Sequence, residues 1–423
     1  MAEIGATDVP FREQAEFWRR KVNVPTATWR DLQRGDHAHG FMVAGAARVD
    51  LLDDLRKAVD RAVLDGATIE DFRRDFDAIV ARTGWDYKGG RNWRTRIIYT
   101  TNLRSSYQAG RWAQIQAIKH RRPYLQYIHN DSVKHPRPDH LAWHGVILRA
   151  DDPWWDTHYG PNGYGCQCTA RTLAERDLRR MGKDGPDEAP TPPDDIAGID
   201  PGFDYNVGMA AGSMPAAVRL GERVMQLPPS WRRIALADAQ QRPTDLFADW
   251  PATVARVLEE QAQGRAYPQG MAHPLGFLRP ATVQALEAGI DAGGRAFAAP
   301  APATALLGAV DNQLHHALRS IKEARGTIAA QLNNLPRWLA DPETAVLWDV
   351  GEGGQSTQQP VLIFARRLGD GRVIKLVFQL DVRDKSHRAL RRERLASNWL
   401  RTISVVSEVS LASANYRWLE RFK

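Results

Sequence analysis

Both cysteines and half of the twelve histidines of this 423-residue chain fall in one segment, residues 120–170. The apolar residues of this segment follow neither a helical nor a strand period, and several prolines interrupt it further. Such a segment cannot become ordered by burying one regular apolar face, so it needs another constraint. A bound metal ion is a constraint that orders small irregular segments.

Two histidines and two cysteines are the candidate ligands. His140 and His144 are four residues apart, a spacing that places both on one face of a helix, and Pro138 suits the start of that helix. Cys166 and Cys168 are two apart, so in an extended strand they point to the same side. A disulfide between them would close a very small, strained ring. Two thiolates and two imidazoles suit tetrahedral Zn²⁺, so the sequence predicts a structural zinc.

Other assignments of this segment stay open. His135 and Asp139 are alternative ligands, whereas His129 and His158 are expected to be ordinary surface or core histidines. The Cys-x-Cys spacing is tighter than the usual Cys-x₂-Cys of zinc sites. In the alternative without metal, the cysteines are buried packing residues and the histidines make hydrogen bonds.

The pattern of the whole chain predicts an α+β protein in three parts. Residues 1–182 are expected to be mainly helical, with an irregular His/Cys segment at 129–168. Residues 183–264 indicate a proline-rich linker and a weakly helical connector. Residues 265–423 indicate a small α+β domain with an antiparallel sheet, in which Gly369-Asp370-Gly371 is a hairpin signal. Helices are expected at Val49–Leu64, from Thr68 to about Gly84, and from about 93 to 119.

Basic charge is concentrated in the last part of the chain. Residues 265–423 hold 21 Lys and Arg against 14 Asp and Glu, which accounts for the net charge of +7, while residues 1–264 hold 36 of each sign. This excess fits an anionic partner such as RNA or DNA, although solvated surfaces often carry a similar excess. No run of about 18 apolar residues occurs, so no membrane contact is expected. The first 20 residues lack the apolar core of a secretory signal.

Several blocks in the first half of the chain occur together in an order typical of one family. They are Lys21 to Trp29, Gly84-Trp85, Arg96 to Arg111, Arg137-x-x-His140-x-x-Trp143-His144-Gly145, Asp152 to Trp155, Pro161 to Cys168 and Asp200 to Asn206. Over about residues 10–210 they resemble the phage Mu F-type head morphogenesis family, the minor capsid proteins of tailed phages. Gln167 departs from this pattern, which has a basic residue between the cysteines, but metal binding barely depends on it.

The resemblance implies a minor head protein that acts in procapsid assembly near the portal. Its implied partners are the portal and the major capsid or scaffolding proteins. Its implied location is the virion, in the capsid interior or at the portal vertex, with the host cytoplasm as the place of assembly. These expectations follow from the resemblance and not from composition or spacing.

Looser blocks in the second half carry another resemblance. They are Val310 to Lys322, Leu335 to Pro342, Val361 to Arg367, Arg372 to Phe378 and Asn398 to Thr402. They resemble nuclease-like domains with a barnase/EndoU/colicin/RelE-type fold, which are often fused behind the Mu F-type domain. The chemistry so implied is metal-independent RNA cleavage, in which a general base takes the 2′-hydroxyl proton and a cation stabilises the phosphorane.

Histidine suits the base near neutral pH, and Arg or Lys suits the contact with phosphate. The candidate catalytic residues are His316, Arg319, Lys375, Arg401 and Thr402. Against them, His316 could be a structural histidine or its neighbour His315 the base, and Lys375 could point to solvent. The basic stretch 383–401 fits a phosphate backbone or a solvated helix face. The alternatives to a head protein with an RNase-like domain are a toxin-type ribonuclease packaged in the virion and a catalytically silent protein that binds nucleic acid.

Overall fold

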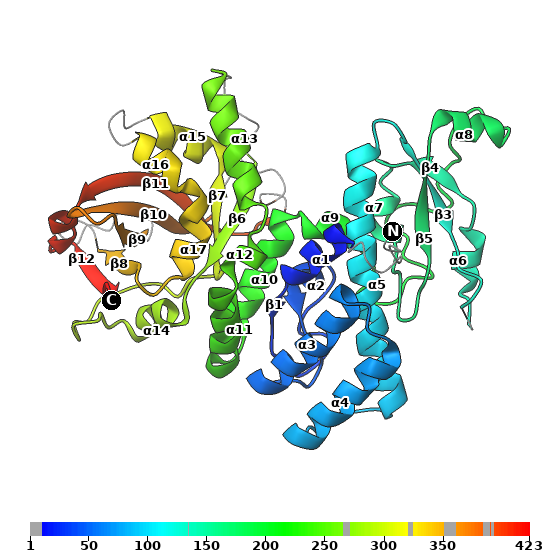
Figure 1. Cartoon of the computed structure of the whole chain (residues 1–423), viewed down its shortest axis with the longest axis horizontal. Helices are drawn as coiled ribbons and strands as arrows, with labels where there is room; N and C mark the ends of the chain where they lie inside the picture. Colours follow the sequence, from blue (N-terminus) through cyan, green and yellow to red (C-terminus); the bar gives the residue numbers. More distant parts are fainter. Residues whose placement is uncertain are drawn as a thin grey trace, which may run out of the picture. The chain divides into compact units, whose positions relative to one another are not determined.

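The computed structural model describes residues 11–133, 135–264, 271–319, 325–350, 361–383, 390 and 393–423. The chain forms two compact units, Met1–Ser213 (unit 1) and Met214–Lys423 (unit 2) (Figure 1). Helices and strands occur in both units, so the predicted α+β class is confirmed. Among the described residues, no helix is long and apolar enough to span a membrane.

One long helix, α5 (Arg91–Ile118), organises unit 1. Helices α3 (Val49–Leu64) and α4 (Ile69–Thr83) pack on it, and all three agree with the helices predicted from the sequence. Thr68 caps α4 through a capping box, and Gly84 ends it in the left-handed conformation. Further elements are α1 (Arg12–Arg19), β1 (Val22–Asn23), α2 (Asp36–His39), β2 (Gly40–Phe41) and α9 (Val207–Ala211).

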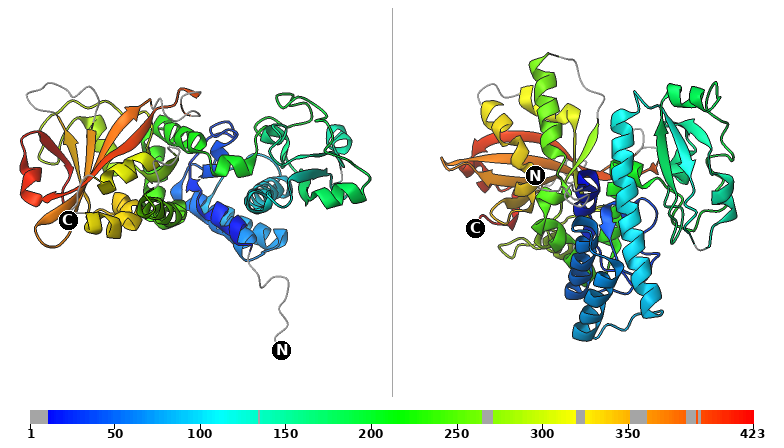
Figure 2. Two further views of the ribbon diagram at one scale, coloured as in Figure 1. Left: turned by 90° about the horizontal axis from the view of Figure 1, so that it is seen from above. Right: turned by 45° about the vertical axis from the view of Figure 1, so that its right-hand side comes forward.

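The segment with the histidines and cysteines folds around a small antiparallel sheet of order β4-β3-β5. Figure 2 (right view) shows α5 running alongside this sheet. The sequence predicted an irregular segment, and the structure differs because each strand is only three to five residues long, too short to show a period. The elements are β3 (Tyr124–Ile128), α6 (Pro138–Ala142), β4 (Ile147–Arg149), α7 (Trp155–His158), β5 (Thr169–Leu173) and α8 (Glu175–Arg180).

The proline-rich stretch after α8 is part of unit 1. Residues 183–206 form no helix or strand but pack against β4, where Asp187 exchanges hydrogen bonds of 2.7 and 2.9 Å with Ile147. The next long helix, α10 (Met214–Gln226), belongs to unit 2 because its apolar face joins a buried cluster around Trp399. The units are therefore divided after residue 213, and not after residues 182 and 264 as the sequence led us to expect.

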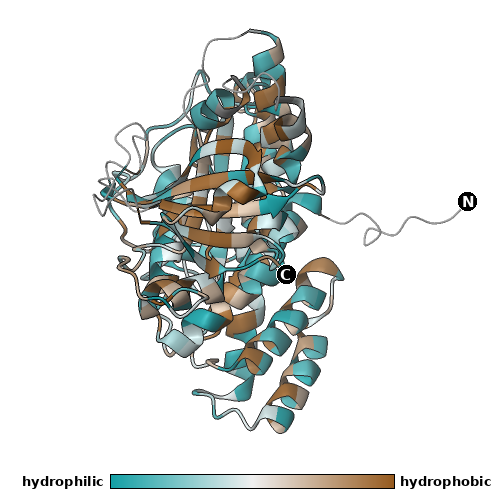
Figure 3. Ribbon diagram, turned by 90° about the vertical axis from the view of Figure 1, so that its left-hand side faces the viewer, coloured by the Kyte–Doolittle hydropathy of each residue, from teal (hydrophilic) through white to brown (hydrophobic). Residues whose placement is uncertain are grey.

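Unit 2 contains a seven-stranded sheet of order β12-β8-β9-β10-β11-β7-β6. Neighbouring strands are antiparallel except β11 and β7, which are parallel, so the predicted antiparallel sheet is confirmed. Figure 3 shows mainly brown, apolar strands and helices of both colours. The strands are β6 (Ala272–Phe277), β7 (Leu306–Val310), β8 (Ala345–Asp349), β9 (Val361–Arg367), β10 (Arg372–Val382), β11 (Ser397–Ser407) and β12 (Tyr416–Glu420).

The helices of unit 2 pack against this sheet and against one another. After α10 they are α11 (Pro229–Gln241), α12 (Pro243–Leu246), α13 (Trp250–Ala262), α14 (Pro280–Ala288), α15 (Asp311–Arg319), α16 (Arg325–Gln331) and α17 (Leu335–Ala340). Two short 3₁₀ helices, η1 (Leu332–Asn334) and η3 (Glu408–Ala412), complete the described elements. The connector predicted as weakly helical thus consists of α10 to α13, which are integral to unit 2.

The β9–β10 hairpin shows how the sequence specifies this sheet. Gly369 and Gly371 in its turn have φ values of 92° and 76°, which glycine adopts without steric cost. From residue 374 on, side chains of β10 alternate between a buried and a half-buried face. Leu376 and Phe378 lie on the buried face, whereas Lys375 lies on the half-buried one.

Unit 1 contains a buried lysine, Lys21. Lys21 is 3% exposed, its Nζ donates a 2.7 Å hydrogen bond to the His37 carbonyl, and it lies over the rings of Phe17 and Trp18. Burial, and then the charge of nearby Arg56, lower the pKa of Lys21 to about 7. Folding therefore favours the neutral amine, while the unfolded chain keeps the ordinary pKa of 10.5.

This difference predicts a stability that depends on pH. Between pH 7 and 10.5 the unfolded chain binds one more proton at Lys21 than the folded chain, so the free energy of unfolding rises with pH, by about 1.4 kcal/mol per pH unit. Lys21→Met removes this contribution. Denaturant unfolding at pH 7.5, 8.5 and 9.5 should therefore give a shallower slope for Lys21→Met than for the wild type. Equal slopes would contradict the burial of a neutral amine here.

Candidate metal centre

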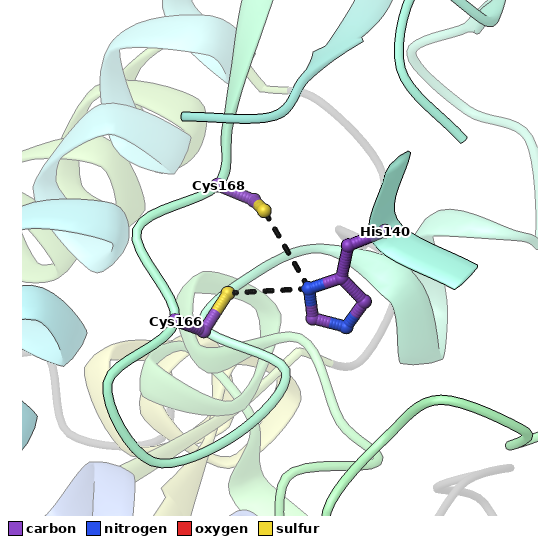
Figure 4. A group of neighbouring side chains, drawn as sticks. All are labelled: His140, Cys166 and Cys168. Carbon is purple, nitrogen blue, oxygen red and sulfur yellow. Dashed lines mark hydrogen bonds between the residues drawn. The ribbon is translucent and has the colours of Figure 1, made fainter. Parts of the chain in front are cut away.

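His140, Cys166 and Cys168 meet at one buried point in unit 1. His140 comes from α6, and the two cysteines directly precede β5. His140 Nδ1 lies 3.8 Å from Cys166 Sγ and 3.5 Å from Cys168 Sγ, and all three ligand atoms lie within 4.8 Å of one another (Figure 4). The three side chains are at most 4% exposed.

The hydrogen bond of His140 to the backbone sets which ring nitrogen faces the thiols. Nε2 lies 3.0 Å from the carbonyl oxygen of Gly198 and donates its proton there, so the lone pair of Nδ1 points to the cysteines. The ring also stacks on Trp143, with centroids 5.0 Å apart. An imidazole held in this way is oriented as in a ligating histidine.

Side chains of helix α5 and of the loop after β3 hold the cysteine loop. Gln108 Nε2 donates a 2.8 Å bond to the carbonyl of Cys168, and Arg104 donates a 3.0 Å bond to the side-chain oxygen of Gln167. Asn130 donates to the same oxygen at 3.2 Å. Gln167 thus accepts from two side chains, which a Lys or Arg at this position could not do.

The pKa values of the two thiols are shifted in opposite directions. A hydrogen bond from Cys168 lowers the pKa of Cys166 well below its ordinary value, against the effect of burial and with help from His140. Donating that bond raises the pKa of Cys168, and burial raises it further. Burial and the nearby thiols also raise the pKa of Tyr127. A divalent cation would favour both thiolates together, since its charge offsets their repulsion.

His144, which the sequence predicted as a ligand, lies outside this group. Helix α6 ends at Ala142, so His140 and His144 do not share a helix face. His144 is exposed, and its Nδ1 accepts a 3.0 Å hydrogen bond from the backbone N–H of His129. The alternatives His135 and Asp139 are also absent from the compact group, for which all described residues were searched.

His129 is a residue that the spacing analysis set aside. It follows β3 directly, is 5% exposed, and places Nδ1 3.5 Å from Cys168 Sγ. It stands 39 residues before Cys168, so no short motif joins the two; its place after an apolar strand was the only available signal. His158, by contrast, is a core histidine as expected, stacked on Trp154 with centroids 4.2 Å apart.

The predicted catalytic residues of unit 2 are not gathered at one point. Lys375 Nζ donates to the Tyr416 hydroxyl at 2.7 Å, and Arg401 donates to the Gln379 side chain at 2.8 Å. Thr402 lies opposite Val377 in the β10–β11 register, on the face that also carries Lys375. This face is thus shared by three of the five predicted residues.

The two helical candidates are placed differently. His316 is exposed on α15, and among the described residues no hydrogen bond joins it to Lys375, Arg401 or Thr402. The side chain of Arg319 lies outside the described residues, as do residues 384–389, 391 and 392 of the basic stretch 383–401. These five assignments therefore stay predictions.

Unit 2 also contains a buried polar network that sequence reasoning missed. The Asp311 carboxylate is fully buried and accepts hydrogen bonds from His273 Nε2 at 2.8 Å and from Arg256 at 3.1 Å. Burial opposes its ionisation, but these two bonds lower the pKa of Asp311 below its ordinary value. His315 lies next to this network, 3.5 Å from Glu260, and is 1% exposed, so His315 is a core residue.

Comparison with known proteins bears on the first half of the chain above all. Residues 53–171, which include the His140, Cys166 and Cys168 group, match the family described as "Phage Mu protein F like protein". This part of unit 1 is similar to the phage Mu F-like family. The resemblance seen in the sequence is thereby confirmed over this region, whereas the comparisons lend no support to the nuclease-like resemblance of residues 265–423.

Two relatives extend this similarity. The F protein of Escherichia phage Mu, whose name gives it a provisional role in capsid assembly, is 34% identical over 191 residues, or 42% of this chain and 43% of that protein. The Mu-like prophage FluMu F protein of Haemophilus influenzae is 29% identical over 374 residues, or 78% of this chain and 84% of that protein. The chain thus spans less than half the length of the phage Mu protein. No solved structure matches the chain.

Gly198 provides a test of how the site is held. Its φ is +78°, and a Cβ at this position would lie 2.5 Å from the Cβ of Asp139. Gly198→Ala should therefore shift the carbonyl that orients His140 and lower the free energy of unfolding by roughly 1–3 kcal/mol. Gly185→Ala is the matched control, because a Cβ there meets nothing within 4 Å and the backbone is not left-handed. Equal denaturation curves for the two variants would contradict this role.

Proposed function

We propose that this chain is a phage capsid assembly protein, a minor head component that acts in procapsid assembly near the portal. The observation that carries the proposal is the similarity to the FluMu F protein, which extends over 78% of this chain and so includes most of both units. The provisional role of the phage Mu protein supplies the kind of function. The proposed partners are the portal, the major capsid and the scaffolding proteins, and the proposed location is the capsid interior or the portal vertex.

A surface of unit 1 supports contact with another protein chain. A cavity of about 710 Å³ is lined by Trp29, Trp93 and Tyr164, which are 43%, 49% and 41% exposed. Exposed aromatic residues gathered around a hollow are typical of protein interfaces. Arg30 lines the same cavity, while Arg34 is paired there with Asp204 at 2.6 Å, so a partner segment with mainly apolar side chains would fit it.

Co-expression with the portal, major capsid and scaffolding proteins of a Mu-like phage tests the proposal. The wild type should co-sediment with the assembled particles. Trp29→Ala combined with Trp93→Ala should lower the co-sedimenting fraction by roughly tenfold, because buried interface aromatics carry much of the binding energy. Val409→Ala, at an apolar residue that is 81% exposed in unit 2, is the control. A wild type that never accompanies the particles would contradict the assembly role.

We further propose that the His140, Cys166 and Cys168 group holds a structural zinc ion. Two soft thiolates and one imidazole are donors that zinc prefers, and His140 is already oriented by its bond to Gly198. When bound, zinc would supply charge compensation for two buried thiolates and would order the loops that carry them. Metal analysis of the purified chain should give about one zinc per chain; a folded chain free of metal would contradict this.

Contact of unit 2 with nucleic acid is a second candidate function, with RNA cleavage as its stronger form. The observation that favours it is the shared face of Lys375, Arg401 and Thr402 on β10 and β11. Two cations and a hydroxyl on one sheet face suit contact with a phosphate. His316 stays the predicted general base, either in a head protein or in a toxin-type ribonuclease carried by the virion. Without cleavage, the same face would make unit 2 a silent binding module.

RNA cleavage by the full chain in EDTA tests the stronger form. The wild type should cleave, and His316→Ala should slow cleavage by at least about 100-fold, because a general base contributes this much. His120→Ala, at an exposed histidine of unit 1, is the matched control. If the wild type does not cleave but binds RNA or DNA with an affinity that falls steeply with salt, unit 2 is a binding module. Absence of both would contradict any nucleic-acid role.

A further inference from the structure

We propose that His129 is the fourth protein ligand of the metal in unit 1, in the place that the sequence assigned to His144. This inference rests on the zinc proposed above and specifies its coordination. It concerns a residue that lies outside the compact group of three and that no motif connects to the cysteines.

The two distances at Cys168 match the nitrogen–sulfur edge of a zinc tetrahedron, whereas His129 lies outside the group whose ligand atoms are all within 4.8 Å of one another, so a bound metal would draw its imidazole closer to that group. Bonds of about 2.3 Å to sulfur and about 2.0 Å to nitrogen place sulfur and nitrogen ligands about 3.5 Å apart. Cys168 Sγ lies 3.5 Å from the Nδ1 atoms of both His140 and His129, and Cys166 Sγ lies 3.8 Å from His140 Nδ1. Cys168 therefore has two imidazole neighbours at the separation that shared coordination requires.

The ring of His129 is buried with few polar contacts among the described residues. The side chain is 5% exposed, and its Nε2 is buried without a hydrogen-bond partner among the described residues. In the part of the chain that the structure describes, the Cys168 thiol is the polar contact of this imidazole. Burying an imidazole with so little compensation is costly, and ligation of a cation would provide the missing interaction.

His144 has a different task, which explains why it does not serve as the ligand. Its Nδ1 accepts the hydrogen bond from the backbone N–H of His129, and its side chain is exposed. This bond joins the His144 ring to the backbone at the end of β3, outside the group of ligand atoms. The ring of His144 therefore stays at the surface and supplies no ligand.

A fourth protein ligand decides the class of metal site. With His129, His140, Cys166 and Cys168 the shell is complete, and no position is left for a water molecule or a substrate. Structural zinc sites are closed in this way, whereas catalytic sites keep one position open. The metal of unit 1 would then stabilise the fold and would not activate water for hydrolysis.

Cobalt substitution in the full chain tests this assignment. Wild type, His129→Ala and His144→Ala are compared by zinc content, by competition with a chelator and by the visible spectrum of the Co²⁺ form. The wild type should show the strong absorption of tetrahedral cobalt. His129→Ala should weaken zinc binding by roughly 100-fold or more and change the spectrum, while His144→Ala should keep the wild-type spectrum.

A ligand exchange keeps the test valid if His129→Ala does not fold. His129→Cys should still bind Co²⁺, with an additional sulfur-to-cobalt charge-transfer absorption, because a third thiolate replaces an imidazole. Wild-type spectra and affinities in both His129 variants would overturn the assignment, as would loss of tetrahedral cobalt in His144→Ala alone. A wild type that takes up neither zinc nor cobalt would refute the zinc proposal itself, whereas a wild type with zinc but no effect at His129 would refute this inference only.

Discussion

The meeting of two thiols and an imidazole inside an aromatic core is the constraint on which residues 124–206 depend. These polar groups are almost inaccessible to solvent and lie in a cluster with Tyr127, Trp143 and Trp154. Such a core cannot hold two neighbouring ionised sulfurs without a cation, because burial and their mutual repulsion both disfavour the second charge. The strands here are short and the connections long, so few backbone ladders would hold the loops if the donor groups separated. A metal shell would join β3, α6 and the start of β5 at one point.

Unit 2 gains its order in a different way. Side chains of β10 alternate between a buried and a half-buried face, and the first four residues of β11 are all buried. This pattern gives the two strands a continuous apolar core. Where it buries charge, it supplies partners: Asp311 is paired with both His273 and Arg256, so none of the three is left uncompensated. This network lies among α13, β6 and α15 and joins three elements that are distant in the sequence. It is therefore a structural device that needs no metal.

The contrast explains which features could be predicted from the sequence. Helices α3 and α4 were predictable, because an apolar stripe, the Thr68 cap and the Gly84 stop all agree locally. The β9–β10 hairpin was predictable from its two turn glycines. Strands β3 to β5 were not, because they are too short for a period and are specified by packing. The members of the candidate metal group were predictable only where spacing carries the information: Cys166 and Cys168 as a pair, and His140 from its proximity to Pro138 in the sequence.

His144 and His129 show why spacing fails for the last ligand. The i, i+4 rule assumes that a helix continues through both residues, but α6 stops after one turn, and the chain turns away before His144. His129 reaches the site through tertiary structure, since the antiparallel pairing of β3 with β5 sets Ile128 opposite Thr169, beside Cys168. Register across a sheet leaves no local signature in the sequence. A closed shell of this kind would suit the proposed assembly role, because it would stabilise an irregular surface and leave its loops free to contact other chains.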